Sequence, residues 1–163
     1  MKIKVAVSAC LLGENVRYDG GNKKMELLSY LPAEKYQLIA ICPEVEMGLG
    51  VPRPAIEIRQ IKTRLRLLQV GNHARDFTEQ FEQWFAQRVE YFHTFSACIL
   101  KSKSPSCGLQ TTPHFRHNRQ FELSDGFFVQ KLRTMLPNMP IIDEKQFKIT
   151  ELRNDFILQL NAV

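Results

Sequence analysis

Ile3-Lys4-Val5-Ala6-Val7-Ser8-Ala9-Cys10 is the stretch that decides the fold, an apolar strand that ends at a cysteine. Residues 36–42 form a second such run, again closed by a cysteine, and residues 95–100 form a third, followed by a cysteine-bearing loop. Apolar residues at helical spacing over 23–31 separate the first two runs. This order predicts a parallel strand pair joined by a right-handed crossover, and hence an α/β protein.

The remaining pattern predicts a three-layer α/β/α arrangement with a mainly parallel sheet and a small rim β-hairpin. The alternating segments 56–61 and 64–70 predict the hairpin. Aromatic residues at helical spacing predict a long amphipathic helix from Asp76 to about His93, with its aromatic stripe in the core. Three further elements are expected: a helix over 124–136, a short strand over 140–142 and a last helix over 150–160.

The 163 residues fit a single domain, 1–163, with 44% hydrophobic and 24% charged residues, a composition typical of globular proteins. The first apolar run is too short for a signal peptide, and no run approaches the roughly 20 apolar residues of a membrane span. We therefore expect a cytoplasmic protein with no membrane association. Its four cysteines are expected to stay reduced and to serve a metal or catalysis rather than disulfides.

The charge balance is positive, with 22 Lys and Arg against 17 Asp and Glu, or +5. Such a balance favours weak attraction to polyanions, nucleic acids among them. The basic residues include those of 59–66 and 116–119, and whether they cluster in space is left open by the sequence. For His114 and His117, which lie in the polar stretch 110–120, a surface role is expected.

Three cysteines are candidates for one shared site. Cys10, Cys42 and Cys107 each follow a strand, and the carboxyl ends of adjacent parallel strands converge on one crevice. Three thiolates holding a metal or a cluster would leave one coordination position open, as in a reactive site. The residues alone also allow three separately buried thiols. Cys98 lies inside an apolar strand and is expected in the core, unless all four cysteines bind a structural zinc.

Polar residues in the same loops could assist chemistry. Glu44, two residues after Cys42, could move a proton at the mouth of the site. Ser104 and Ser106 could hydrogen-bond a substrate or a cluster sulfur, although turn serines commonly bond their own backbone. Cations in these loops, which could stabilise an anionic cluster or substrate or simply face water, are Arg17, Arg53, Lys101 and Lys103.

The chain resembles the TudS/RudS-like family of thiouracil and tRNA thiouridine desulfidases, whose domain is called DUF523. The resemblance covers nearly the whole chain and rests on five ordered motifs: Ser8-Ala9-Cys10-Leu11-Leu12-Gly13, Arg17-Tyr18-Asp19-Gly20-Gly21, Cys42-Pro43-Glu44-Val45, Gly48-Leu49-Gly50-Val51-Pro52-Arg53, and Leu100-Lys101 through Ser104-Pro105-Ser106-Cys107-Gly108.

The resemblance implies an iron-sulfur-dependent, non-redox desulfidase of the hydrolase or lyase type, which replaces the sulfur of a thiolated pyrimidine with oxygen and releases hydrosulfide. It implies a 4Fe-4S cluster with one open iron and three cysteine ligands, which by motif are Cys10, Cys42 and Cys107. It further implies that Glu44 and Ser104 assist catalysis. We also expect a role in substrate binding or support for Arg17, Asp19, Arg53, Lys101 and Ser106.

The implied substrate is 4-thiouridine in tRNA, or free thiouracil or thiouridine. The motif after Cys42 is similar to the tRNA-acting branch, in which a second domain is commonly fused. These 163 residues contain no counterpart of that domain, so a separate companion domain or protein is a candidate partner. The chain also has Val16 where many relatives carry another cysteine. The competing hypothesis is a non-catalytic module that binds zinc or an iron-sulfur cluster in a structural or redox-sensing role.

Overall fold

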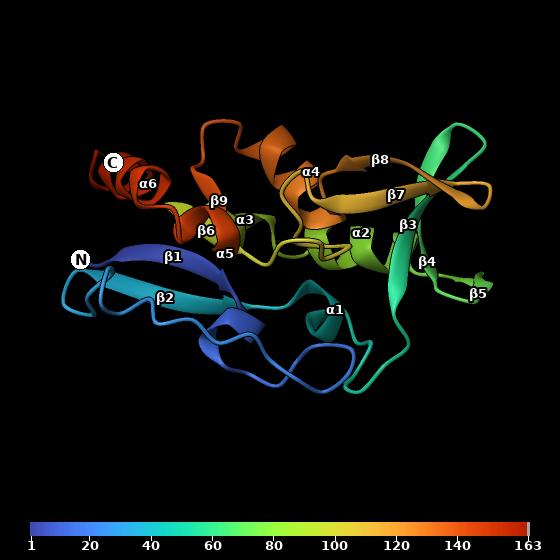
Figure 1. Cartoon of the computed structure of the whole chain (residues 1–163), viewed down its shortest axis with the longest axis horizontal. Coiled ribbons are helices and arrows are strands. Elements are labelled where there is room, and N and C mark those ends of the chain that lie inside the picture. The colour runs from blue at the N-terminus through green and yellow to red at the C-terminus, as the bar shows by residue number, and fades with distance from the viewer. Residues whose placement is uncertain (163) are drawn as a thin grey trace.

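Two β-sheets organise the protein, for which a computed structural model describes residues 1–162 (Figure 1). The first sheet has the strand order β2-β1-β6-β9, and all of its pairs are parallel. Its strands are β1 (Ile3–Ser8), β2 (Tyr36–Ile41), β6 (Ala97–Leu100) and β9 (Ile141–Asp143). The predicted α/β class, with a parallel sheet begun by the stretch 3–10, is confirmed.

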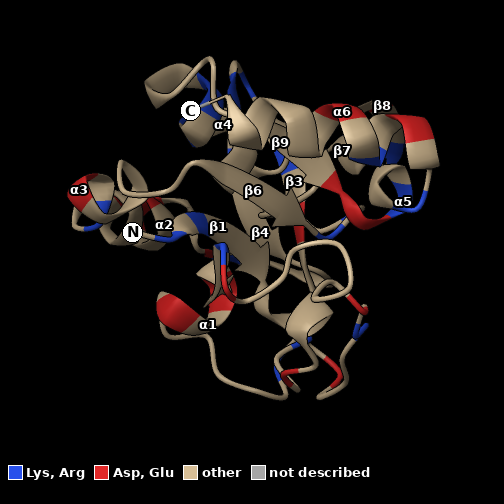
Figure 2. Ribbon diagram, turned by 90° about the vertical axis from the view of Figure 1, so that its left-hand side faces the viewer, with Lys and Arg blue, Asp and Glu red and all other residues tan. Residues whose placement is uncertain are grey.

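The parallel sheet is apolar at its centre. In the register, Val5 lies beside Leu38 of β2 on one side and Ala97 of β6 on the other. Every residue of β6 is buried. None is charged, so the β6 ribbon is tan in Figure 2. Strands that are covered on both faces read as continuous apolar runs, which is why these segments were recognisable in the sequence.

The second sheet is mixed, with the order β5-β4-β3-β7-β8. The predicted hairpin is confirmed as β3 (Ile56–Ile61) and β4 (Arg64–Gln69), but it belongs to a larger sheet than expected. The other strands are β5 (Asn72–Asp76), β7 (Thr112–Arg116) and β8 (Arg119–Ser124). Strand β7 pairs in parallel with β3, and β8 pairs antiparallel with β7.

The surface role expected for His114 is wrong. His114 lies beside Ile58 in the register, on the core-facing side of β7, and only 1% of its surface is exposed. Its Nε2 donates to the Asp125 carbonyl at 3.0 Å. His117, in the turn that follows β7, is exposed as expected.

Several predicted helices differ from those in the structure. Residues 23–31 form no helix, because Lys23 N and Met25 N donate to the carbonyls of Cys10 and Leu11 rather than within a helix. The predicted long helix is divided into α2 (Thr78–Ala86) and α3 (Val89–Phe92). The other helical elements are the 3-10 helix η1 (Ala9–Leu12), α1 (Pro43–Glu46), α4 (Phe127–Met135), α5 (Glu144–Phe147) and α6 (Thr150–Asn161).

The aromatic stripe lies in the core as predicted. Phe85 contacts Phe92 with ring centroids 4.9 Å apart, and Trp84 and Phe128 extend the same cluster. Cys98 is fully buried beside it, with its Sγ 3.5 Å from the Met139 Sδ, so its predicted core position is also confirmed. Within residues 1–162, no helix has the length and apolar character that a membrane span requires.

The start of helix α4 is fastened to the loop that carries Cys107. The first N–H groups of a helix have no partner within it, and α4 has no side-chain cap. Its partners are loop carbonyls instead: Gly126 N donates to Gly108 O at 2.8 Å, Phe127 N to Pro105 O at 3.0 Å, and Phe128 N to Ser106 O at 3.0 Å. A side chain at position 126 would overlap the Ser106 carbonyl, which explains the glycine.

We predict that Gly126→Ala lowers the free energy of unfolding by about 1–3 kcal/mol, because the added methyl group must displace this loop. The backbone of Gly126 has φ −64°, which any residue can adopt, so the cost is steric. Urea unfolding would measure it. Gly71→Ala is the control, since Gly71 has φ +77° and open space around it, and the cost there is about 1 kcal/mol of backbone strain. Wild-type stability of Gly126→Ala would show that the loop yields freely.

Candidate active site

All three cysteines that were predicted as ligands line one cavity of about 330 Å³. Cys10 lies in η1 directly after β1, Cys42 lies between β2 and α1, and Cys107 lies in the loop after β6. The three strands are neighbours in one parallel sheet, so their carboxyl ends open at the same edge. The crevice expected from the strand order is therefore present, with the three thiols in its wall.

The thiols of Cys10 and Cys107 are buried and that of Cys42 is half-buried, and the three lie within electrostatic range of one another. Burial raises the pKa of Cys10 to about 11, although the charges of Lys101 and Arg17 oppose the shift. Burial also raises the pKa of Cys107, against hydrogen bonds to its sulfur from Ser8 and Ser106. Thiolates here need a compensating positive charge, which bound iron or another thiophilic metal centre would provide.

The chemistry of the donor set is compatible with an iron-sulfur cluster. Soft thiolates are the ligands that iron-sulfur clusters and zinc prefer. Within residues 1–162, no three His, Cys, Asp or Glu side chains converge on a point where one metal ion could bind. The irons of a cluster each take their own cysteine, so its ligands need not converge. Cys98 does not line the cavity, and a zinc site made by all four cysteines is therefore excluded.

Glu44 is held as a buried carboxylate in the wall of the cavity. Only 8% of its surface is exposed, and its Oε1 accepts from Arg53 Nε at 3.1 Å. Its Oε2 accepts from the Ser106 hydroxyl at 3.2 Å. Arg53 also donates from Nη1 to the carbonyls of Val16, at 2.8 Å, and Gly50, at 2.9 Å. Arg53 thus fixes the orientation of Glu44.

Ser104 shapes the loop that presents Cys107. Its Oγ accepts from the backbone N–H groups of Cys107, at 2.9 Å, and Ser106, at 3.2 Å. Its hydroxyl also lies 3.1 Å from the Ser106 Oγ. Ser104, Ser106 and Glu44 therefore form one continuous hydrogen-bonded chain along the cavity wall.

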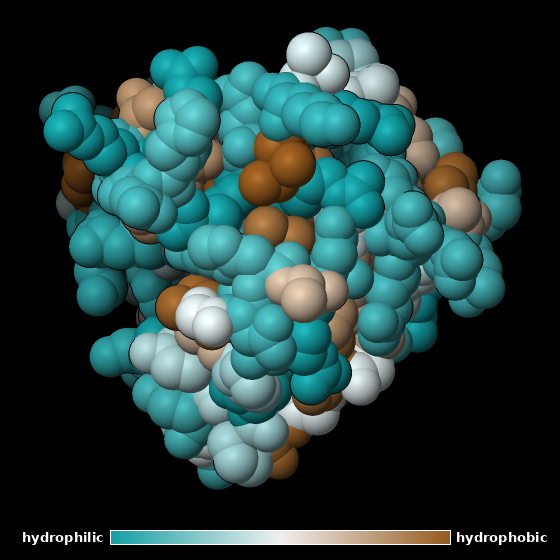
Figure 3. Space-filling view, turned by 90° about the vertical axis from the view of Figure 1, so that its right-hand side faces the viewer, coloured by the Kyte–Doolittle hydropathy of each residue, from teal (hydrophilic) through white to brown (hydrophobic). Residues whose placement is uncertain are grey.

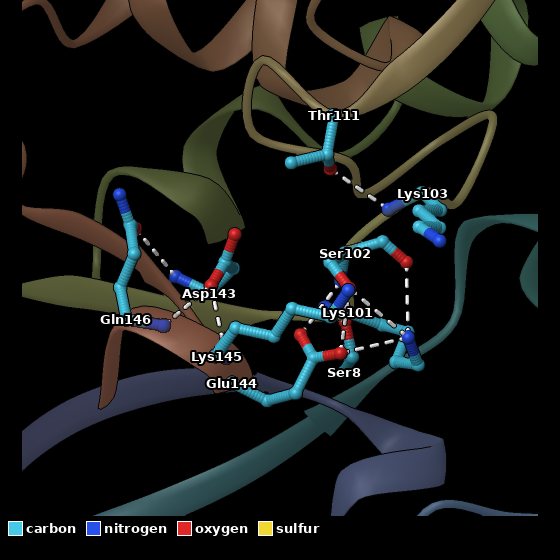
Figure 4. Close-up of polar contacts among 9 residues, drawn as sticks. All are labelled: Ser8, Lys101, Ser102, Lys103, Thr111, Asp143, Glu144, Lys145 and Gln146. Atoms are coloured by element: carbon cyan, nitrogen blue, oxygen red, sulfur yellow. Dashed lines mark hydrogen bonds and ion pairs between the residues drawn. The ribbon is translucent and has the colours of Figure 1, made fainter. Parts of the chain in front are cut away.

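Lys101 and Glu144 form a second polar cluster beside the cavity (Figure 4). Lys101 Nζ lies 2.7 Å from Glu144 Oε1, and Ser102 donates to the same carboxylate from its N at 2.7 Å and from its Oγ at 2.6 Å. Lys101 N donates to Ser8 Oγ at 2.9 Å. Burial alone would raise the pKa of Glu144, but the bonds from Lys101 and Ser102 outweigh it and the pKa is lowered. The carboxylate thus stays charged and holds the Lys101 ammonium in place.

Sequence reasoning missed Glu144. The available signal was its place directly after the short strand β9, which is a fourth parallel strand with its carboxyl end at the same edge. Tyr18 was also missed, and it lines the cavity beside the expected Arg17. Arg53, Lys101 and Ser106 line the cavity as well. Asp19 does not; it is exposed and its Oδ1 accepts from Gly21 N at 2.9 Å, which stabilises a turn.

Comparison with known proteins gives matches over most of the chain. The model of the 2-thiouracil desulfurase family matches residues 5–144. An uncharacterised protein of Bacillus subtilis (strain 168), YbbK, is 32% identical over 112 residues, which cover 64% of this chain and 72% of YbbK. The solved structure of the 4Fe-4S-dependent thiouracil desulfidase TudS is 30% identical, with a TM-score of 0.73 over 99% of this chain and 100% of TudS. The chain belongs to the 2-thiouracil desulfurase family.

Proposed function

We propose that this protein is a 4Fe-4S-dependent desulfidase of the hydrolase or lyase type, formed by one domain over residues 1–163, that replaces the sulfur of a thiolated pyrimidine with oxygen. The observation that carries the proposal is a single cavity lined by three thiols, a buried carboxylate and a hydroxyl: Cys10, Cys42, Cys107, Glu44 and Ser104. The similarity to TudS, a 4Fe-4S-dependent thiouracil desulfidase, supports it.

Cys10, Cys42 and Cys107 would hold the cluster and leave one iron without a protein ligand. When bound, the cluster supplies a thiophilic Lewis acid for the substrate sulfur. The cations Lys101 and Arg17, whose charges act on Cys10, would stabilise the anionic thiolate-ligated group. Hydrogen bonds from Ser8 and Ser106 to the Cys107 sulfur would adjust its electron density.

The remaining work is proton transfer by the residues of the chain. Water supplies the oxygen of the new C=O bond, the sulfur leaves as hydrosulfide with one proton, and a second proton is released. This balance requires no electrons, so the reaction is non-redox. Glu44 accepts the released proton, either directly or at Oε2 from Ser106, which lies next to Ser104 in the hydrogen-bonded chain. Ser104 orients the pyrimidine ring or the departing sulfur.

The thiolated substrate has two candidate forms: 4-thiouridine within tRNA, and free thiouracil or thiouridine. The net charge of +5 favours the polyanion. The cavity, at about 330 Å³, is large enough for one pyrimidine in either form. We place the reaction in the cytoplasm, where thiols remain reduced, and a companion protein could present the tRNA.

We predict that anaerobic reconstitution with iron and sulfide gives a brown protein with about four irons per chain. Serine in place of Cys10, Cys42 or Cys107 should lower the iron content and the visible absorbance, because a hydroxyl is a poor ligand for these irons. The matched control is Cys98→Ser, which removes a thiol that lies outside the cavity. Stoichiometric zinc without colour in the wild-type protein would instead favour a non-catalytic metal-binding module.

Glu44→Gln and Ser104→Ala should each lower kcat for sulfide release by about 10²–10⁴-fold, the usual contribution of a proton-transfer group. Glu44→Gln should keep the iron content and visible spectrum of the wild type, because Glu44 is not a proposed ligand. Ser104→Ala also removes the acceptor for the Cys107 and Ser106 N–H groups, so its kcat is compared per bound cluster. Glu90→Gln, an exposed carboxylate of α3, is the control. Normal kcat in Glu44→Gln with a full cluster would remove Glu44 from the reaction.

The substrate form can be assigned by comparing sulfide release from 2-thiouracil, 4-thiouridine and thiolated tRNA at about 50 and 200 mM salt. Activity on tRNA should fall steeply as salt rises, because binding a polyanion releases counterions, whereas activity on a neutral base should change little. Salt-independent or absent activity on tRNA would exclude the polymer. A protein with a full cluster that releases no sulfide from any of the three would refute the proposed function.

A further inference from the structure

We propose that the end of the second sheet formed by the β3–β4 and β7–β8 turns binds the phosphate backbone of a single-stranded nucleic acid, at a distance from the base in the cavity. This inference rests on the proposed function for the identity of the polymer, which is the one that carries the thiolated pyrimidine. The charge, the aromatic residues and the position of these turns each support it. We call this surface the turn surface and define it as residues 59–66 and 115–121.

The turn surface concentrates positive charge. Strands β3 and β7 are parallel neighbours and each begins an antiparallel hairpin, so the two turns lie at the same end of the sheet (Figure 1). The surface contains no Asp or Glu. Its cations are Arg59, Lys62, Arg64, Arg66, Arg116 and Arg119. The two sequence segments that were basic but separate are thus joined by the fold.

Four of these cations have no carboxylate partner among residues 1–162. Arg59 pairs with Glu57 and Arg66 with Asp76. The ion pairs found within residues 1–162 do not include Lys62, Arg64, Arg116 or Arg119, all of which are exposed. Figure 3 views the molecule from this side and shows a largely hydrophilic face with scattered hydrophobic residues. Unpaired cations on such a face suit a polyanion.

Aromatic rings lie among these arginines. The Arg116 guanidinium lies 4.9 Å from the centroid of Phe121, which is 36% exposed, and the Arg59 guanidinium lies 5.2 Å from that of Phe115. Arg59 also donates to the His117 carbonyl and so ties the two turns together. Exposed rings interleaved with arginines bind single strands by stacking on bases and by attracting phosphates. An acidic polypeptide would pair with the arginines but has no bases to stack on the rings, so the rings favour a nucleic acid.

The sheet also fixes the distance between the turn surface and the cavity. Strand β3 begins at the cavity, where Ile56 lines the wall, and β7 begins where Thr112 Oγ1 donates to Ser104 O at 2.6 Å. Six residues of strand span about 20 Å. At about 3.4 Å per stacked nucleotide, that length corresponds to roughly six nucleotides. A free base or mononucleotide cannot occupy both places, whereas a polynucleotide can.

The test measures binding of the reconstituted full-length protein to fluorescein-labelled, unthiolated single-stranded RNA of twelve uridines, by anisotropy at about 50–200 mM salt. The variant is Arg116→Gln/Arg119→Gln. Its matched control is Lys2→Gln/Lys35→Gln, which removes the same charge from the exposed residues Lys2 and Lys35 at the far side of the fold. We expect roughly tenfold weaker binding for the first and wild-type binding for the second, with the salt slope reduced by about 1.4 in the first.

Phe121→Leu separates the contribution of base stacking to RNA binding from that of charge, because leucine keeps the apolar volume and removes the ring. We expect this variant to bind RNA more weakly with an unchanged salt slope. All three variants should retain the wild-type thermal unfolding curve and wild-type sulfide release from 2-thiouracil, which tests the proposed function by itself. On a thiolated RNA, KM should rise and kcat should stay constant.

Three results would overturn the inference: no RNA binding by the wild-type protein at about 50 mM salt, equal binding by the arginine variant and its lysine control, or competition by polyglutamate as effective as that by unlabelled RNA. Because the RNA probe carries no sulfur, these results are independent of turnover. If the protein binds this RNA through the turn surface but releases no sulfide from 2-thiouracil, the proposed function is refuted, whereas the inference about the turn surface still holds.

Discussion

The fastening of helix α4 to the Ser104–Gly108 loop is the constraint on which the site depends. Three helix N–H groups need acceptors that the helix cannot supply, and three carbonyls of the loop are those acceptors. The same contact satisfies the helix and fixes the backbone of Cys107. Since α4 packs through Phe128 into the aromatic core, the position of Cys107 is set by hydrophobic packing between the two sheets.

Charged side chains form two ion pairs at the cavity, one in its wall and one beside it. Arg53 holds Glu44, and Glu144 holds Lys101. A buried ion pair gains little net stability, because desolvation offsets the attraction between its members. The value of these pairs is geometric. Arg53 holds Glu44 within loop 42–53 and also donates to the Val16 carbonyl, which ties this loop to residues 16–18. The Glu144 pair joins the loops after β6 and β9. The wall is thereby held against the mobility that long loops usually have.

The sequence predicted the elements whose signal is local and apolar. β1, β2 and β6 read as continuous apolar runs, so the convergence of Cys10, Cys42 and Cys107 followed from topology. The predictions that were wrong concern segments whose hydrogen-bond or strand partners are distant in the sequence. The segment 23–31 has helical spacing, but its N–H groups bond to the carbonyls of η1. The polar segment 112–124 forms strands because β3 offers an edge, and His114 is buried by that pairing. Glu144 was overlooked although it follows a predicted strand, because its partner, Lys101, lies 43 residues away.

The buried position of Cys98 determines which thiols of the folded protein can be reached from the cavity. Burial raises the pKa of this thiol to about 12. The side chain is fully buried, and its sulfur contacts that of Met139. In the folded chain, a reagent that enters the cavity meets the thiols of Cys10, Cys42 and Cys107 but not that of Cys98. Steric occlusion thus keeps Cys98 out of ligand exchange and disulfide formation, before any chemical selectivity operates. The fold, rather than the number of cysteines in the sequence, limits how many thiols are available to a metal centre in this cavity.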